Sequence, residues 1–181
     1  MKRLTLPLDE KTRTSLRAGE VVYLSGTMYT ARDAAHKKLK ETIDRGESLP
    51  FDLKDQVIYY VGPTQAKPDQ AIGSAGPTTS GRMDVYTPEL LDMGLKGMIG
   101  KGYRTDAVKE AIVRNKAVYF IAAGGAGALL SQCIKKAEMV AYPELLAEAI
   151  RKLEVVDFPV FVGIDTLGND IYQEEKKHEC L

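Results

Sequence analysis

Residues 97–122 read GMIGKGYRTDAVKEAIVRNKAVYFIA, in which two short apolar runs flank a segment with helical spacing. The runs at 97–99 and 117–122 have the length and composition of strands. From Thr105 onward, apolar residues recur on one helix face: Val108, Ala111 and Ile112. A strand, a helix and a second strand in this order indicate an α/β architecture.

The same alternation extends along the rest of the chain. Further strands are predicted at residues 20–24, 56–61, 138–141 and 160–164. The last of these is followed by a turn through Leu167, Gly168 and Asn169, and then by residues 170–173, which we interpret as the second strand of a hairpin.

Three further helices are predicted from caps and apolar spacing. One begins with a capping box of Thr30 and Asp33, in which each side chain satisfies a free backbone N–H, and ends at Gly46. Another begins at Pro143, and a short one spans residues 87–91. The expected buried faces are Ala31, Ala35, Leu39 and Ile43 in the first, and Leu145, Leu146, Ala149, Ile150 and Leu153 in the second.

Length and charge limit the class of protein. The 181 residues suit a single domain, expected at 1–172, followed by a charged tail at 173–181. The 25 basic and 25 acidic residues balance, so overall charge does not attract the chain to nucleic acid or to an anionic membrane. Neither a signal peptide nor a membrane-spanning apolar run is recognisable, and a cytoplasmic location is expected.

Two features bear on metal clusters and nucleotides. Cys133 and Cys180 are interpreted as free thiols in preference to a disulfide, and two cysteines are too few for an iron–sulfur cluster, so no metal site is expected in this chain. The glycine-rich segment at 124–127 lacks the lysine and hydroxyl of a phosphate-binding loop and the glycine spacing of a dinucleotide site. Close packing of a helix on a strand is the preferred explanation for it.

The irregular stretch at residues 62–84 is too long for a mere connection. Its centre, GPTTSGRMD at 76–84, combines glycines with three hydroxyl residues and Arg82. One interpretation is an anion pocket, because glycines let backbone N–H groups approach a ligand and an arginine can bind a carboxylate through two N–H groups. The other is a hydroxyl-rich turn that caps the helix at Thr87, with Arg82 paired to Asp84. Composition alone leaves the two balanced.

Two more basic positions are placed to meet an anion. Arg32 lies in the first turn of its predicted helix, where unpaired N–H groups and the helix dipole favour negative charge. His36 shares its face, and we prefer a structural role for it over direct catalysis, with a solvated basic face as the alternative. Lys101, bracketed by Gly100 and Gly102, lies between a predicted strand and a helix, where a strand's carboxyl end meets ligands.

Taken in order, these motifs resemble one family. SG at 25–26, TARDAAH at 30–36, GPTTSGRMD at 76–84 and GKG at 100–102 look like class I fumarases. In that family they belong to the carboxyl-terminal domain, or to the separate beta subunit of two-chain fumarases and L-tartrate dehydratases. The resemblance continues through AAGG at 122–125 and VGID at 162–165, so it covers nearly the whole chain.

The resemblance implies a fold and a set of roles. The fold is a swivelling β/β/α domain, and a partner alpha subunit carries a [4Fe-4S] cluster. The threonine matching Thr78 is the base that removes the C3 proton of malate, and the residues matching Arg32, Arg82 and Lys101 hold the substrate carboxylates. The choice of Thr78 over Thr79 rests on the resemblance alone. Four further residues are expected to lie next to these site residues without contacting the substrate: Asp33, His36, Thr79 and Asp84.

The expected activity is that of a fumarate hydratase of the citric acid cycle, at a site shared with the alpha subunit. L-tartrate dehydratase is the alternative enzyme, since it eliminates water from a substrate with one more hydroxyl. A non-catalytic anion-binding or scaffolding module is the alternative from another class. The expected partners are the alpha subunit and a dicarboxylate substrate, in a homo-oligomer or a dimer of alpha–beta pairs.

Overall fold

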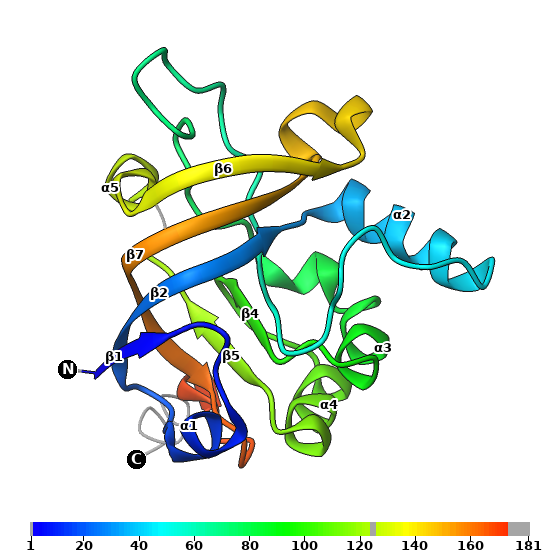
Figure 1. Ribbon diagram of the computed structural model, residues 1–181. Coiled ribbons are helices and arrows are strands. Elements are labelled where there is room, and N and C mark those ends of the chain that lie inside the picture. Colours follow the sequence, from blue (N-terminus) through cyan, green and yellow to red (C-terminus); the bar gives the residue numbers. More distant parts are fainter. Residues whose placement is uncertain (1, 124–125, 174–181) are drawn as a thin grey trace.

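The strands of the chain form one sheet that closes on itself. The structure is a computed structural model that describes residues 2–123 and 126–173. Its strands are β1 (Lys2–Thr5), β2 (Val21–Thr30), β3 (Val57–Tyr59), β4 (Gly97–Gly100), β5 (Val118–Ile121), β6 (Ile134–Ala141) and β7 (Ile150–Ile164). They are ordered β1-β2-β3-β4-β5-β7-β6, and β2 also pairs with β7, so β2, β3, β4, β5 and β7 close a barrel-like ring (Figure 1).

Helices connect the parallel strands of this ring. β2, β3, β4 and β5 are parallel neighbours, and β7 runs antiparallel to both β2 and β5. The connections pass through α2 (Asp33–Asp44), α3 (Thr87–Asp92) and α4 (Asp106–Asn115), which lie along one side of the sheet in Figure 1. The remaining described helices are α1 (Glu10–Ser15), α5 (Gly127–Gln132) and two short 3-10 helices, η1 (Ser80–Met83) and η2 (Pro143–Glu148). None of the described helices is long and apolar enough to cross a bilayer.

Alternating side chains of the strands build two cores. Each strand of the ring contributes to the first, which fills the closed sheet: Leu24, Tyr59, Ile99, Phe120 and Val162. The neighbouring residues on the other face, such as Ile58 and Tyr119, join the second core with residues of α2, α3 and α4. Burial of each such large side chain contributes about 1.5–3 kcal/mol, so the two cores hold the strand ends in fixed positions.

Most of the predicted elements are confirmed. The α/β class, the six strands before the terminal hairpin, the helix from Thr105 and the short helix at Thr87 are all present. Thr105 caps α4 by accepting a hydrogen bond from the Val108 N–H at 3.4 Å. Gly46 follows α2 with φ +69°, a conformation that glycine adopts without strain. The sequence did not predict β1, α1 or α5.

The helix predicted from Pro143 is wrong. The segment forms only the short η2, and β7 begins at Ile150, so Leu153 is buried as a strand residue. Leu146 has φ +55° and is 74% exposed. The long pairing of β7 with β2 and β6 overrides the local helical pattern, because it provides a hydrogen-bonded ladder and two buried faces.

The capping box at Thr30 is also wrong. Thr30 is the last residue of β2, and its hydroxyl accepts a hydrogen bond from the Arg151 N–H at 3.0 Å. The N-cap of α2 is Arg32, and no described side chain caps this helix.

The hairpin predicted at 170–173 is present only as a single bridge between Ile164 and Asp170. Two further predicted features lie outside the described residues, namely Gly124-Gly125 and nearly all of the tail (174–181).

Candidate active site

The predicted basic residues meet at one edge of the sheet. β2, β3 and β4 are parallel neighbours, so their carboxyl ends lie side by side. Arg32 follows β2 and Lys101 follows β4. Between them, at the end of β3, a Cβ atom on Gly62 would lie 2.9 Å from the Cδ and Nη1 atoms of Arg32. The absence of a side chain at Gly62 therefore gives Arg32 its space, at the carboxyl ends of parallel strands, where α/β proteins commonly bind ligands.

The hydroxyl-rich segment returns to this same edge. The Thr78 N–H donates to the Tyr60 carbonyl at 2.7 Å, and the Ser80 N–H donates to the Lys101 carbonyl at 2.9 Å. Thr79 forms a parallel bridge with Lys101. Residues 78–80 are thus held like a short extra strand between the ends of β3 and β4. Thr78 is half-buried there, whereas Thr79 is exposed.

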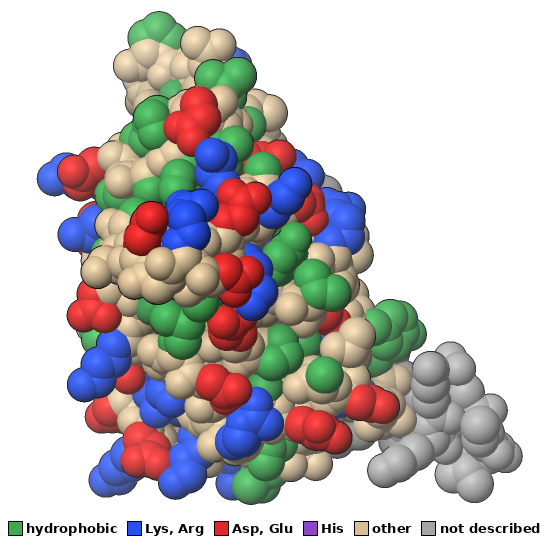
Figure 2. All heavy atoms as spheres, turned by 90° about the vertical axis from the view of Figure 1, so that its right-hand side faces the viewer, with side chains coloured by type: hydrophobic (Ala, Val, Ile, Leu, Met, Phe, Trp, Pro, Cys, Tyr) green, Lys and Arg blue, Asp and Glu red, His purple; other side chains and the backbone are tan. Residues whose placement is uncertain are grey.

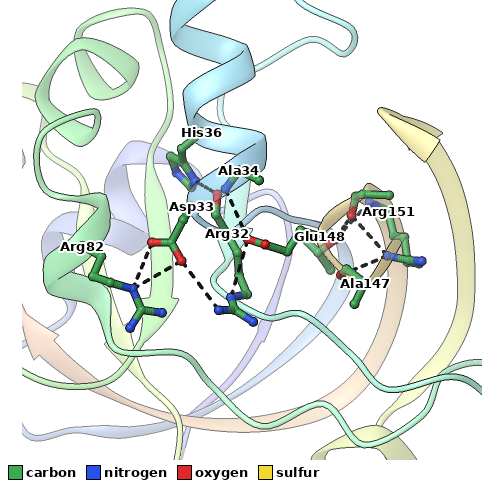
Figure 3. A network of polar contacts seen from close by, with 10 residues as sticks. Arg32, Asp33, Ala34, His36, Arg82, Ala147, Glu148 and Arg151 are labelled. Atoms are coloured by element: carbon green, nitrogen blue, oxygen red, sulfur yellow. Dashed lines mark hydrogen bonds and ion pairs between the residues drawn. The ribbon is translucent and has the colours of Figure 1, made fainter. Parts of the chain in front are cut away.

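Asp33 lies between the two arginines. The Nε atom of Arg82 donates to the Asp33 carboxylate at 3.0 Å, and Nη2 of Arg32 lies 3.6 Å from its other oxygen (Figure 3). Burial alone would raise the pKa of Asp33, but the hydrogen bond from Arg82 and the charges of Arg82 and Arg32 hold it below the ordinary value. Figure 3 shows the terminal nitrogens of Arg82 pointing away from Asp33, and the side chain is 53% exposed. Arg82 is therefore oriented by one carboxylate and still open to a second.

Glu148 flanks Arg32 on its other side. Its Oε1 atom lies 3.9 Å from Nε of Arg32 and accepts a hydrogen bond from the Ala34 N–H at 3.2 Å. The turn that carries Glu148 is fastened by Arg151, which donates to the carbonyls of Leu146, Ala147 and Ala149 (Figure 3). The sequence interpretation missed Glu148, because the segment around it was predicted to be a helix.

His36 lies beneath this edge. It is buried, and its Nδ1 atom is 2.8 Å from the Arg32 carbonyl, so Nδ1 carries the proton of this hydrogen bond. Burial lowers the pKa of His36 to about 4 and keeps the ring neutral near pH 7. The alternative of a solvated basic face is wrong for this residue. A neutral imidazole cannot bind a carboxylate by charge, and its contact is with the backbone of Arg32.

A buried ion pair underlies the hydroxyl-rich segment. Asp84 accepts from Nε of Arg104 at 2.6 Å and from the Thr105 N–H at 2.7 Å, and both charged side chains are almost completely buried. The predicted pairing of Arg82 with Asp84 is therefore wrong, since Arg82 pairs with Asp33. The helix α3 is not capped by a side chain of this segment either. Arg104 was not predicted as part of the site, because nothing in its local sequence distinguishes it from an exposed arginine.

The charge at this edge is local. Figure 2 views the side of the molecule that carries α2, and it shows acidic and basic side chains interspersed over the surface, in keeping with the net charge of +0. The positive charge of Arg32 and Lys101, which follow β2 and β4, is therefore a local feature of this edge and not of the whole surface.

The chain does not fit an iron–sulfur cluster. Residues 2–123 and 126–173 contain no group of three His, Cys, Asp or Glu side chains that could hold a metal ion. Cys133, which ends α5, is unpaired, and Cys180 lies outside the described residues. Two cysteines cannot supply the ligands of a cubane cluster.

Comparisons with known proteins agree with these motifs. A family model described as Fumarase C-terminus matches residues 2–175. The aerobic class I fumarate hydratase of Salmonella typhimurium is 46% identical over 159 residues, which cover 87% of this chain and 27% of that protein. The L(+)-tartrate dehydratase subunit beta of Escherichia coli is 34% identical over 181 residues, covering 97% of this chain and 89% of that protein. A putative L(+)-tartrate dehydratase subunit beta of Methanocaldococcus jannaschii is 38% identical over 176 residues, covering 94% of this chain and 90% of that protein. The chain thus spans less than a third of the Salmonella enzyme.

Proposed function

The chain belongs to the Fumarase C-terminus family, and from that premise we propose that it is the beta subunit of a fumarate hydratase. The reaction is the reversible hydration of fumarate to L-malate, at a site shared with a larger partner subunit. The observation that carries the proposal lies at the carboxyl ends of β2, β3 and β4. Arg32 follows β2 and shares Asp33 with Arg82, and the backbone of residues 78–80 is hydrogen-bonded to Tyr60 and Lys101.

The three cations suit a substrate with two carboxylates. The open terminal nitrogens of Arg82 match one carboxylate with two parallel N–H···O bonds, and Arg32 and Lys101 supply positive charge for the other. Asp33 keeps Arg82 oriented before the substrate arrives. Its negative charge also offsets the repulsion between Arg32 and Arg82.

Thr78 is proposed as the base. In the direction from malate to fumarate, its Oγ1 atom, as the alkoxide, takes the proton from C3. The electron pair of the broken C–H bond is held on the substrate and then forms the C2=C3 double bond, as the C2–O bond breaks and the hydroxyl leaves as hydroxide. A free threonine hydroxyl is a poor base, so the nearby cations have to favour its alkoxide. The same cations stabilise the negative charge that develops on the substrate carboxylate. Thr78 is favoured over Thr79 because its backbone is fixed to Tyr60 and its side chain is less exposed.

The [4Fe-4S] cluster is proposed to belong to the partner, since the residues of this chain do not fit it. The partner would be an alpha subunit, because relatives of this length are named as beta subunits. We further propose that residues 1–172 form one domain of the swivelling β/β/α type, in a cytoplasmic dimer of alpha–beta pairs.

L-tartrate dehydratase is the second candidate function. The observation in its favour is length, because this chain covers about nine-tenths of the tartrate dehydratase beta subunits it matches. The same cations would hold tartrate, because its two carboxylates are separated by two carbon atoms, as they are in malate.

An anaerobic hydration assay tests the proposal. The purified chain is assayed alone and together with the alpha subunit carrying an intact cluster, on fumarate, malate and L-tartrate. Turnover of fumarate in the mixture alone supports the proposal, and faster turnover of tartrate supports the second candidate. A mixture that turns over none of the three, or one that keeps its rate after both Thr78→Ala and Thr79→Val, would favour the non-catalytic anion-binding module.

A further inference from the structure

Two buried side chains tie together the two segments that carry the candidate catalytic residues. Residues 78–84 carry Thr78 and Arg82, and residues 101–105 carry Lys101. Residues 101–105 leave the sheet after β4, and residues 78–84 return to it after the long stretch that follows β3. Backbone contacts of Thr79 and Ser80 with Lys101 join the two segments at one point only. The ties cross from one segment to the other beneath the surface.

The first tie is the hydroxyl of Tyr119, on β5. It lies 2.8 Å from the hydroxyl of Ser80 and donates to the Gly102 carbonyl at 2.9 Å. Since the Tyr119 proton is used on Gly102, Ser80 is the donor in the contact between the two hydroxyls. Burial raises the pKa of Tyr119 well above its ordinary value, so the hydroxyl keeps the proton that this bond needs.

The second tie is Arg104, whose side chain is 0% exposed. Its Nε atom binds Asp84 at the end of the hydroxyl-rich segment, and its Nη2 atom donates to the hydroxyls of Tyr60 and Thr87 at 3.1 Å each. The guanidinium also packs against the ring of Tyr119, with Cζ 4.7 Å from the ring centroid. The two ties therefore contact each other and form one unit.

Glycine at position 100 allows this close approach. A Cβ atom there would collide with the Ser80 hydroxyl and lie 2.8 Å from a ring carbon of Tyr60. Residues 78–80 thus lie directly against the end of β4. The buried charges of Arg104 and Asp84 face each other, hydroxyl groups, the Thr105 N–H and two tyrosine rings. Separating the partners of a buried ion pair is costly, because it leaves a buried charge uncompensated. The unit consequently permits only a narrow range of spacings between the two segments.

We propose that Tyr119 and Arg104 are positioning residues, which set the distance of Thr78 and Arg82 from Lys101 without touching the substrate. This inference rests on the proposed function for its effect on turnover, although the geometry itself can be measured in the chain alone. Misplacement of a catalytic group by 1 Å can cost about a hundredfold in rate. We therefore expect small changes in either tie to lower the rate of the reaction.

The experiment uses two conservative variants and two matched controls. Tyr119→Phe removes the bridging hydroxyl and keeps the ring, and Arg104→Lys keeps the charge next to Asp84 but loses the fork of donors. Tyr142→Phe is the control for a hydroxyl pair, since Tyr142 contacts Thr42 at 3.4 Å away from both segments. Arg13→Lys is the control for a buried guanidinium, because Arg13 is 6% exposed and binds the Lys116 carbonyl.

The first readout is kinetic, in the assembled complex and normalised to cluster content. Tyr119→Phe and Arg104→Lys should each lower kcat about tenfold or more and change KM less than kcat, because the cations remain present but the base is misaligned with the substrate that they bind. The two controls should keep kcat within about twofold. Loss of folded complex with an unchanged kcat in the remainder would overturn the proposal, because that result marks a role in stability alone.

The second readout is amide hydrogen exchange in the full chain without its partner. The Ser80 N–H, which donates to Lys101, should exchange about tenfold faster in Tyr119→Phe, whereas the Ala122 N–H, which donates to Gly100, should not change. Equal exchange at Ser80 in variant and wild type would contradict the proposal. This readout stands even if the wild-type complex hydrates no fumarate, so the failure of the proposed function and that of this inference can be told apart.

Discussion

At the scale of single residues, the arginine at 82 is the most directly testable. Its Nε atom is occupied by Asp33 while its terminal nitrogens point outward. Replacing Arg82 by Ala should lower kcat/KM by about thirtyfold to several thousandfold, equivalent to about 2–5 kcal/mol for one partner of a charged hydrogen-bonded pair. Arg45→Ala, which removes an exposed arginine paired with Glu47, serves as the control. A loss below about threefold in Arg82→Ala, in the assembled complex, would exclude a carboxylate-binding role.

The two threonines can be separated by their side-chain chemistry. Thr78→Ala removes the hydroxyl, and kcat should fall by at least about a hundredfold if that oxygen takes the proton. Thr78→Ser restores a hydroxyl and should recover a measurable part of kcat. Thr79→Val keeps the shape of the exposed neighbour and should retain most of the rate. The assignment of the base would pass to Thr79 if Thr79→Val were the inactive variant.

Because His36 is neutral in the folded chain, the free energy of unfolding should depend on pH. Its pKa is about 4 in the folded chain against an ordinary value of 6.5, so the unfolded chain binds the extra proton between these values. Protonation of His36 therefore does not lower the stability of the folded chain above pH 6.5, and it lowers that stability progressively as the pH falls from 6.5 towards 4. Between pH 7.5 and 5.0 this loss should be on the order of 2 kcal/mol in the free energy of unfolding. Urea titrations of wild type and His36→Gln would measure it, and equal losses in both proteins would rule out His36 as the source.

At the scale of elements, the junction of β4 with residues 78–80 depends on Gly100. A methyl group at Gly100 would meet the Ser80 hydroxyl and the ring of Tyr60, so Gly100→Ala should destabilise the chain by about 1–3 kcal/mol through overpacking. Gly81→Ala is the matched control in the adjoining segment. A Cβ atom at Gly81 would find only the Tyr103 carbonyl, at 3.9 Å. Thermal or urea unfolding would compare the two, and an equal effect at both positions would contradict the packing at Gly100.

The arrangement of helices and strands also explains which parts of the site could be predicted from the sequence. Arg32 and Lys101 lie just after two parallel strands of the sheet, so their location at one edge follows from local pattern and general topology. Glu148, Arg104 and Tyr119 could not be predicted, because their roles depend on contacts with residues 114, 20 and 39 positions away. The segment from Pro143 has apolar residues that suit a helix or a buried strand, and only the pairing of β7 decides between them.

At the scale of the whole molecule, the proposed function makes this edge half of a site. Arg82 is held by Asp33, which also lies beside Arg32, and the backbone of Lys101 is bridged to Thr79, so the two arginines and the Lys101 backbone are already held in place in this chain. The edge is nevertheless open, because Arg82 and Thr79 are exposed. A dicarboxylate should therefore bind the lone chain weakly, and much more tightly once the partner covers the edge and excludes water.

Succinate, which cannot undergo the reaction, probes this difference. For a dissociation constant on the order of 10 mM, 50 mM succinate should stabilise the lone chain by about 1 kcal/mol, a rise of about 2–4 °C in Tm. Arg82→Gln should abolish most of that rise, whereas Arg45→Gln should not, and sodium chloride at equal ionic strength is the control for general screening. The assembled complex should show a larger rise at the same concentration. An equal rise with chloride would mean that the lone chain has no preformed dicarboxylate site, and that the partner has to order these cations as well as cover them.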